Sequence, residues 1–366
     1  MKIQMVDLGR QYREIKGEID DSIQSVVDSG QFILGPDVKE LEHDLADYVG
    51  VKHAIGCANG TDALQIALMS LGVGPGDEVI TTPFTFVATA EVAALLGAKT
   101  VFADVREDDF NIDSKEVERK ITGKTKAIVP VHLFGQPAMM DELVEISSSR
   151  GVPIVEDAAQ AFGAEYKGKK MCSLGKIGCV SFFPSKNLGA YGDGGMIFTS
   201  DDDLAKKMRA IVSHGSEKKY YHDYIGVNSR LDTIQAAILR VKFRRLDRYN
   251  ELRSGFAGKY TERLKGAVGT PRTFSDRKHI FHQYTIRTGR RDQMLDYLKE
   301  NGIPSAVYYP VPLHLQKAYQ YAGYKAGDFP ISEKLSREVL SLPMHPHLLD
   351  EEVELITATI KRFLGK

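Results

Sequence analysis

Short apolar runs alternate with segments of helical periodicity between residues 50 and 200, and this alternation constrains the fold of the 366-residue chain most strongly. The apolar runs lie at residues 53–58, 78–83, 100–105, 126–135, 152–158, 179–184 and 194–200. They lack the period-two alternation of a half-solvated strand, which indicates strands covered on both faces. Strands that alternate with helices predict an α/β fold, with a mostly parallel sheet of about seven strands between two helical layers.

The sequence pattern changes after residue 230. Residues 231–266 form one amphipathic, charge-rich stretch, which predicts a long connecting helix that leaves the first domain. The rest of the chain mixes strand and helix patterns, which is typical of a smaller α+β domain. Because single cores stop growing near about 250 to 300 residues, we expect a large domain at residues 1–245 and a small one at 246–366.

The composition excludes several classes of protein. The chain carries 48 Lys and Arg against 49 Asp and Glu, so no basic field attracts nucleic acid or a membrane surface. The N-terminal sequence becomes polar within ten residues and no apolar run approaches the roughly 18 residues that span a bilayer, which predicts a cytoplasmic protein. Three cysteines without a CxxC spacing and ten histidines without ligand spacing predict neither a disulfide framework nor a metal site.

Chemically distinctive residues lie at or after the ends of three of the apolar runs. Ligands bind beyond the carboxyl ends of the strands in an open parallel sheet. Residues 59–62 (NGTD) suit either a phosphate at a helix start or a plain helix cap. Asp157 would cap a helix or, if buried, need a cationic or proton-donating partner. Lys186, in SFFPSKNLGAYGDGG (181–195), is either a solvated loop lysine or an amine held out of water for chemistry.

Taken together, these three features describe a site for pyridoxal 5′-phosphate (PLP). The lysine amine forms a Schiff base with this cofactor, a carboxylate keeps its ring nitrogen protonated, and helix-start N–H groups hold its phosphate. The aromatic residues of TPFTF (82–86) follow another predicted strand and suit stacking on the ring face.

Six motifs in order carry a resemblance to a known family. They are NGTDAL (59–64), FTFVAT (84–89), EDAAQ (156–160), SFFPSKNLG (181–189), GDGG (192–195) and GVNSRLD (226–232). The chain resembles the DegT/DnrJ/EryC1/StrS sugar aminotransferases over essentially its whole length. The resemblance implies a PLP-dependent transferase of fold type I, like aspartate aminotransferase, with a large mostly parallel sheet domain and a small C-terminal α+β domain.

The resemblance also implies roles for individual residues. Lys186 would form the Schiff base, Asp157 would contact the pyridine nitrogen, and Gln160 would lie near the 3-hydroxyl. The ring-stacking position falls on Phe86, and the phosphate-binding positions fall on Gly60, Thr61 and Ser181. Asn228 would reach the same phosphate from the other subunit, which requires a homodimer with shared active sites. Arg230 would face the substrate, where a guanidinium suits a carboxylate or an anionic sugar nucleotide.

The substrates implied by the resemblance are L-glutamate and a keto nucleotide sugar. The form K-N-L-G-x-x-G-D-G-G after Lys186 is similar to that of enzymes that act at C3 of the sugar rather than C4. This favours a UDP-linked 2-acetamido-3-keto sugar, the glucuronic acid form included, in O-antigen or other surface polysaccharide synthesis, with a dTDP-3-keto-6-deoxyhexose as the alternative. Tyr308 and Tyr309 border the expected sugar site, where many relatives carry His in place of Tyr308. His314 would lie near the sugar or be a structural histidine.

Three other functions are compatible with parts of the pattern. A dehydratase of the same family would carry His in place of Lys186. An NAD-dependent sugar dehydrogenase would place a G-x-G-x-x-G turn after its first strand, whereas the glycine cluster here, residues 72–76, precedes a strand. A non-catalytic sensor of the same fold would have no need of the lysine, carboxylate and phosphate set.

Overall fold

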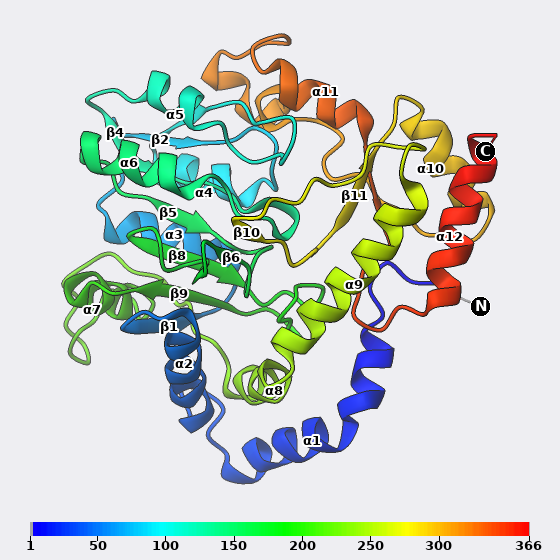
Figure 1. The fold of residues 1–366 in the computed structure, drawn as a ribbon. Coiled ribbons are helices and arrows are strands. Elements are labelled where there is room, and N and C mark those ends of the chain that lie inside the picture. Colours follow the sequence, from blue (N-terminus) through cyan, green and yellow to red (C-terminus); the bar gives the residue numbers. More distant parts are fainter. Residues whose placement is uncertain (1–2, 366) are drawn as a thin grey trace.

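The computed structural model describes residues 3–365 and has a sheet at its centre with helices around it (Figure 1). The strand order is β1-β9-β8-β5 in one half and β4-β2-β3 in the other, and parallel bridges from Ile128 to Ile154 and from Val131 to Asp157 join β4 to β5. The strands are β1 (His53–Cys57), β2 (Glu78–Thr81), β3 (Lys99–Phe102), β4 (Thr125–Ile128), β5 (Val155–Asp157), β8 (Ile177–Ser181) and β9 (Gly195–Thr199). In this sheet of the described chain, β9 runs opposite to the other six strands, which are parallel to one another, so the predicted mostly parallel sheet is confirmed.

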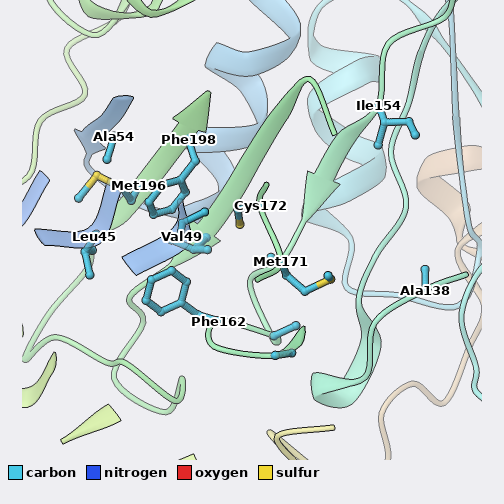
Figure 2. Packing of buried hydrophobic residues seen from close by; sticks show 14 of the residues in the cluster. Leu45, Val49, Ala54, Ala138, Ile154, Phe162, Met171, Cys172, Met196 and Phe198 are labelled. Carbon is cyan, nitrogen blue, oxygen red and sulfur yellow. The ribbon is translucent and has the colours of Figure 1, made fainter. Parts of the chain in front are cut away.

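Both faces of this sheet are buried, as the apolar runs predict. Met196 and Phe198 of β9 point into one hydrophobic cluster, which Figure 2 shows, and Ile197 between them points into another. The first cluster is covered by α2 (Pro36–Val49), α5 (Ser114–Lys120), α6 (Met140–Arg150) and α8 (Thr233–Phe243). The second is covered by α3 (Gly60–Ser70), α4 (Ala88–Leu95) and α7 (Asp202–Ile211).

The predicted connecting helix is two helices in the structure. α8 ends at Phe243 and α9 spans Leu246–Leu264, with a break at Arg244 and Arg245. The Arg245 guanidinium donates to the carbonyl of Val241 at 3.1 Å and pairs with Glu18 of α1 (Leu8–Ser29). No glycine or proline lies at this break. Side-chain contacts with α1 stabilise it instead. Figure 1 shows α9 crossing from α8 to the C-terminal part of the molecule.

The C-terminal part has a separate core. β11 (Tyr284–Arg287) pairs antiparallel with β12 (Val339–Leu342), and they pack with α9, α10 (Arg291–Glu300) and α12 (Asp350–Phe363). Ile3 from the N-terminus lies in the same cluster, while the boundary at residue 245 stays a prediction. The remaining elements are β6 (Glu165–Tyr166), β7 (Lys169–Lys170), β10 (Arg277–Lys278), α11 (Pro330–Glu338) and the 3₁₀ turns η1 (Leu133–Gly135), η2 (Leu313–Leu315) and η3 (Lys317–Ala322). Among residues 3–365, the structure has no helix long and apolar enough to cross a membrane.

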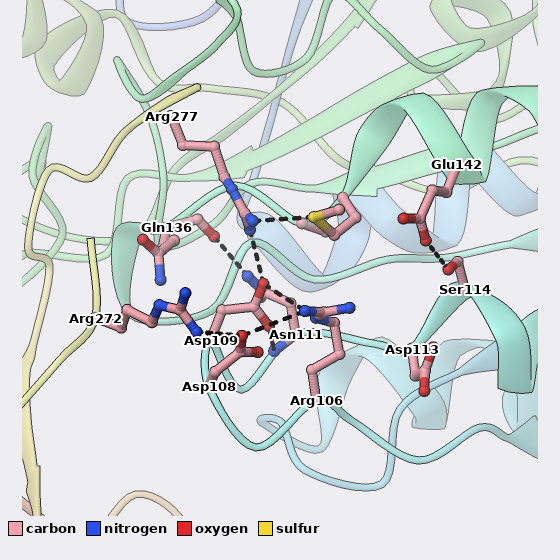
Figure 3. A network of polar contacts seen from close by, with 12 residues as sticks. Arg106, Asp108, Asp109, Asn111, Asp113, Ser114, Gln136, Glu142, Arg272 and Arg277 are labelled. Atoms are coloured by element: carbon pink, nitrogen blue, oxygen red, sulfur yellow. Dashed lines mark hydrogen bonds and ion pairs between the residues drawn. The ribbon is translucent and has the colours of Figure 1, made fainter. Parts of the chain in front are cut away.

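A buried ion pair joins β10 to the loop that follows β3 (Figure 3). Arg277 Nη1 lies 2.7 Å from Asp109 Oδ2, and both side chains are almost fully removed from solvent. The same Arg277 nitrogen donates to the carbonyl of Pro137 at 2.9 Å. Burial raises the pKa of Asp109 more than the Arg277 charge lowers it, so this carboxylate depends on its partner to stay ionised.

Candidate active site

A cavity of about 800 Å³ lies at the carboxyl ends of four strands of the main sheet. Its walls include residues that directly follow β1, β2, β5 and β8, together with residues from the C-terminal part of the chain. The predicted site residues that line it are Gly60, Thr61, Phe86, Asp157, Gln160, Ser181, Lys186, Tyr308 and Tyr309. This volume is typical of a pocket for a small molecule with a cofactor.

Lys186 lies in a tight loop after β8. Its backbone N–H donates to the carbonyl of Phe183 at 2.8 Å, and Ala190 N donates to the carbonyl of Phe182 at 2.7 Å. The side chain is half-buried where it opens into the cavity. Burial lowers the pKa of Lys186 to about 8, and the nearby charge of Asp157 opposes this shift. A neutral amine, able to act as nucleophile or base, is therefore accessible near neutral pH.

Asp157 ends β5 with its side chain almost fully buried beside the cavity. Its carboxylate accepts hydrogen bonds from Thr89 Oγ1 at 2.6 Å and from Ala159 N at 3.1 Å. The backbone is fixed on the other side, because Asp157 N donates to the carbonyl of Pro130 at 2.9 Å. Residues 158–164 form turns rather than a helix, so Asp157 does not act as a helix cap.

The neighbouring Glu156 anchors β5 from the opposite side. Its two carboxylate oxygens accept the backbone N–H groups of Cys172, Leu174 and Gly175 at 2.6 to 2.9 Å. His132 Nε2 lies 3.0 Å from Glu156 Oε2, and the other ring nitrogen accepts from Ala138 N. His132 is thus the tautomer with its proton on Nε2, donating to Glu156. This network fixes the strand end from which Asp157 projects.

The start of α3 is a ready anion site. Asn59 Oδ1 accepts from Asp62 N at 2.8 Å, and its carbonyl accepts from Ala63 N. The N–H groups of Gly60 and Thr61 have no protein acceptor among the residues that the structure describes. An added Cβ on Gly60 would lie 2.6 Å from Ser181 Cβ, so only glycine lets the helix start approach the end of β8 this closely. Free N–H groups at a helix start suit a phosphate.

Aromatic residues form one wall of the cavity. The Phe86 ring is 55% exposed and lies 6.5 Å from the Tyr309 ring, centroid to centroid. Gln160 Nε2 donates to the Tyr309 hydroxyl at 3.1 Å, while Gln160 Oε1 accepts from Phe134 N at 2.8 Å. Burial raises the pKa of Tyr309, which keeps its hydroxyl protonated. An exposed ring beside a fixed amide suits a flat aromatic ligand.

Three predicted residues do not line the cavity of their own chain. Asn228 is exposed and Arg230 is half-buried, with no ion pair for Arg230 among residues 3–365. His314 is buried, 3.1 Å from Glu333 Oε1 through Nε2, and its ring packs against Phe329. The turn η2 directs His314 toward α11, so its position favours the structural histidine that the sequence left open.

The structure also places in the cavity residues whose roles were not predicted from the sequence. Thr89 lies in the first turn of α4, and its hydroxyl donates to Asp157. The sequence motif FTFVAT (84–89) contains Thr89 but did not predict this contact. His282 comes from the chain just before β11, about 100 residues after Lys186, and no local pattern marks it. Its arrival depends on how the C-terminal part packs against the sheet.

The side chains present fit PLP. An anion-binding helix start, an amine with a lowered pKa, a buried carboxylate and an exposed aromatic ring surround one cavity, and each matches one part of this cofactor. Among the described residues, no three His, Cys, Asp or Glu side chains gather as a metal site would require.

Comparisons with known proteins agree with this chemistry. Residues 13–361 match the DegT/DnrJ/EryC1/StrS aminotransferase family. The chain is 53% identical to the pleiotropic regulatory protein of Geobacillus stearothermophilus, over 99% of each chain. It is 50% identical to the UDP-2-acetamido-2-deoxy-3-oxo-D-glucuronate aminotransferase of Pseudomonas aeruginosa, over 98% of this chain and 99% of that protein.

Solved structures show the same fold. A DegT/DnrJ/EryC1/StrS aminotransferase from Brucella abortus superposes with a TM-score of 0.97 at 43% identity, over 100% of both chains. The PLP form of a sugar aminotransferase from Streptococcus pneumoniae superposes with a TM-score of 0.90 at 27% identity, over 95% of this chain and 96% of that one.

Proposed function

Because the chain belongs to the DegT/DnrJ/EryC1/StrS aminotransferase family, we propose that it moves the amino group of L-glutamate to the C3 keto group of a nucleotide sugar. It is an aminotransferase, and its cofactor is PLP. The observation that carries the proposal is the cavity in which Lys186, with its lowered pKa, lies with Asp157 and the free N–H groups of α3.

The residues around the cavity divide the work of holding the cofactor. When bound, PLP supplies an electron-withdrawing ring that stabilises negative charge at the reacting carbon. Asp157 would hold the ring nitrogen, Gln160 the 3-hydroxyl and Phe86 the ring face. Gly60, Thr61 and Ser181 would hold the phosphate, since the α3 start and the end of β8 meet there.

Lys186 is the proposed catalytic residue. Its neutral Nζ takes the proton from the α-carbon of the amino donor and later returns a proton during transfer to the acceptor. The lowered pKa makes the neutral form available for this role. The half-buried position of Lys186 and the apolar wall near it limit competing proton exchange with water.

The proposed acceptor is a UDP-linked 2-acetamido-3-keto sugar. Support comes from the sequence after Lys186 and from the 3-oxo sugar in the name of the Pseudomonas aeruginosa relative. Tyr308 and Tyr309 line the cavity and are proposed to contact this sugar. Tyr308 stands where many relatives carry His, which keeps both a sugar without the glucuronic carboxylate and a dTDP-3-keto-6-deoxyhexose as alternatives. The product would enter surface polysaccharide such as O-antigen.

We also propose a homodimer with shared active sites in the cytoplasm. Asn228 and Arg230 lie outside the cavity of their own chain, as residues that serve a partner's site would. In that arrangement Asn228 contacts the phosphate and Arg230 the anionic part of the substrate.

An amination assay tests the proposal. Purified protein should be yellow from bound PLP and should convert 3-keto UDP-sugars, with L-glutamate as donor, faster than the 4-keto or dTDP-linked members of the same panel, with the product position read by NMR. Lys186→Ala should abolish turnover, whereas Lys169→Ala, at an exposed lysine of β7, should leave it unchanged. A colourless protein without turnover would instead favour a regulatory role, as the name of the Geobacillus stearothermophilus relative suggests.

A further inference from the structure

His282 lies in the wall of the cavity that also contains Lys186, and no role has been given to it so far. Its side chain is 4% exposed. Its carbonyl accepts from Arg253 Nη1 at 3.4 Å, so the backbone is held by a buried arginine of α9. Because this buried histidine shares a cavity with a reactive amine, it matters which of its ring nitrogens carries the proton.

Two asparagine side chains, Asn250 and Asn187, connect His282 to the backbone through a series of hydrogen bonds. Asn250 Nδ2 donates to the carbonyl of Phe162 at 3.4 Å, which makes Asn250 Oδ1 the acceptor of the next bond. Asn187 Nδ2 donates to that oxygen at 2.6 Å and also to the carbonyl of Ile280 at 3.3 Å. Because both amides end on backbone carbonyls, which can only accept, the direction of the whole chain is determined.

The last bond of this chain fixes the tautomer of His282. Asn187 Oδ1 lies 3.2 Å from His282 Nδ1 and can only accept, so Nδ1 carries the proton. His282 Nε2 is then left with a free lone pair. Burial lowers the pKa of His282 well below its ordinary value, and the charges of Lys186 and Arg253 lower it further, so the ring is neutral. His282 therefore offers a fixed acceptor that does not compete for a proton.

The Lys186 amine lacks a partner of this kind. Among the described residues, Lys186 Nζ makes no hydrogen bond or ion pair, although His282 and Asp157 are close enough to interact with it electrostatically. An amine that must accept a proton from one direction gains from having its N–H bonds held elsewhere. Asn187 follows Lys186 directly in the sequence and also hydrogen-bonds to His282, so it connects the backbone of Lys186 with the His282 ring.

We propose that His282 is a positioning residue: once the flexible Lys186 side chain turns toward it, His282 Nε2 accepts an N–H of the free amine and so directs the lone pair of the amine toward the substrate proton. The proposal deepens the proposed function and rests on it for the role of Lys186. It assigns to Asn187 and Asn250 the function of holding the His282 tautomer.

The first experiment determines the tautomer directly in the full-length wild-type protein. Selective ¹⁵N labelling of histidine, assigned with a His282→Gln variant, should show a protonated Nδ1 and an unprotonated Nε2 for His282 at neutral pH. A proton on Nε2, or a charged ring, would overturn the proposal. This measurement does not depend on turnover, so it separates the failure of this proposal from failure of the proposed function.

The second experiment measures the reactivity of Lys186 in cofactor-free protein. The rate of its modification by fluorodinitrobenzene, followed by peptide mass spectrometry against pH, gives the pKa of the amine. A neutral acceptor stabilises the ammonium form, so His282→Phe should lower this pKa below that of the wild type. His279→Phe is the matched control, since His279 is buried three residues earlier but lies outside the cavity. Equal Lys186 pKa values in wild type and His282→Phe would overturn the proposal.

Kinetics complete the test in the PLP-loaded enzyme. His282→Phe should lower kcat by roughly 10- to 100-fold with KM nearly unchanged, because a misdirected amine affects proton transfer rather than binding. His282→Gln retains a polar group and should recover part of the loss, and His279→Phe should keep the wild-type kcat. An unchanged kcat in His282→Phe would contradict the proposal, and a variant that fails to fold leaves the decision to the tautomer of the wild-type protein.

Discussion

Replacement of Gly60 by alanine tests how the cofactor phosphate is held. The added Cβ would lie 2.6 Å from Ser181 Cβ and 3.1 Å from both Ser181 Cα and Ser181 Oγ. Two of these three atoms are Cα and Cβ, which cannot rotate away, so α3 and β8 must move apart. Overpacking of this kind costs about 1 to 3 kcal/mol of stability. The same movement draws the Gly60 and Thr61 N–H groups away from the position proposed for the phosphate.

The effect on PLP affinity follows from those two N–H groups. A hydrogen bond to a charged group contributes about 1.5 to 3 kcal/mol. Loss of the equivalent of one such bond weakens binding by roughly 10- to 100-fold, since about 1.4 kcal/mol is a factor of ten. Titration of cofactor-free protein with PLP, followed by visible absorbance, gives Kd, and thermal unfolding of the same protein gives the stability change.

Two further variants make the result specific. Gly255→Ala, in α9, places its Cβ where no described atom lies within 4 Å, and should be neutral or stabilising by about 0.5 to 1 kcal/mol. Ser181→Gly removes the Cβ with which the methyl group added by Gly60→Ala would collide. The double variant should therefore lose less stability and affinity than the sum of the two single losses. Strict additivity, or a Gly60→Ala protein with wild-type Kd and unfolding temperature, would refute the reasoning.

Three other predictions follow from the site and its surroundings. Thr89→Val removes the hydroxyl that donates to Asp157 without changing shape, and should lower the unfolding free energy in urea by about 1 to 3 kcal/mol; no change would mean that the carboxylate finds another donor. Lys186→Met should stabilise cofactor-free protein below pH 8, because the wild type there carries a desolvated ammonium group. This stabilisation should disappear as the pH rises from about 8 toward 10.5, the ordinary pKa of lysine. A difference in unfolding temperature that does not change with pH would contradict the lowered pKa of Lys186. Arg277→Met leaves the Asp109 carboxylate buried without its partner and should cost about 3 to 5 kcal/mol, most of which a second change, Asp109→Leu, should restore in the same denaturation assay.

The sequence predicted the central sheet because each strand is an apolar run with no solvated face. It did not predict the direction of β9. The 13 residues between β8 and β9, residues 182–194, form no helix, and parallel neighbours require a longer crossover that usually contains one. The antiparallel pairing of β9 is therefore explained by a signal that was already in the sequence. Strand direction depends on connection length rather than on hydrophobicity.

The residues of the candidate site that lie near strand ends could be predicted from the sequence, whereas those that come from a helix start or from the C-terminal part could not. Gly60, Asp157 and Lys186 lie at or within a few residues of strand ends, so the topology of the sheet brings them together once the strands are known. Thr89 and His282 reach the cavity through a helix start and through the packing of the C-terminal part. Local patterns carry no information on contacts of this kind. Arg230 and Asn228 lie outside the cavity of their own chain, so their place in the site stays a prediction.

The two helices predicted as one connector also hold the loop that carries Lys186. The buried Lys242 of α8 donates to the carbonyl of Gly189, and Gln235 Oε1 of the same helix accepts from Tyr191 N at 2.9 Å. Beyond the break, Asn250 of α9 accepts from Asn187 at 2.6 Å. Burial lowers the pKa of Lys242 to about 7, so the fold keeps a costly desolvated amine at this point. In a helix that only connected two domains, a polar residue on the buried face would destabilise the fold, because its desolvation would bring no benefit. Here those residues, from helices on both sides of the break, hold the loop that carries the Lys186 amine, which explains why the connecting segment contains them.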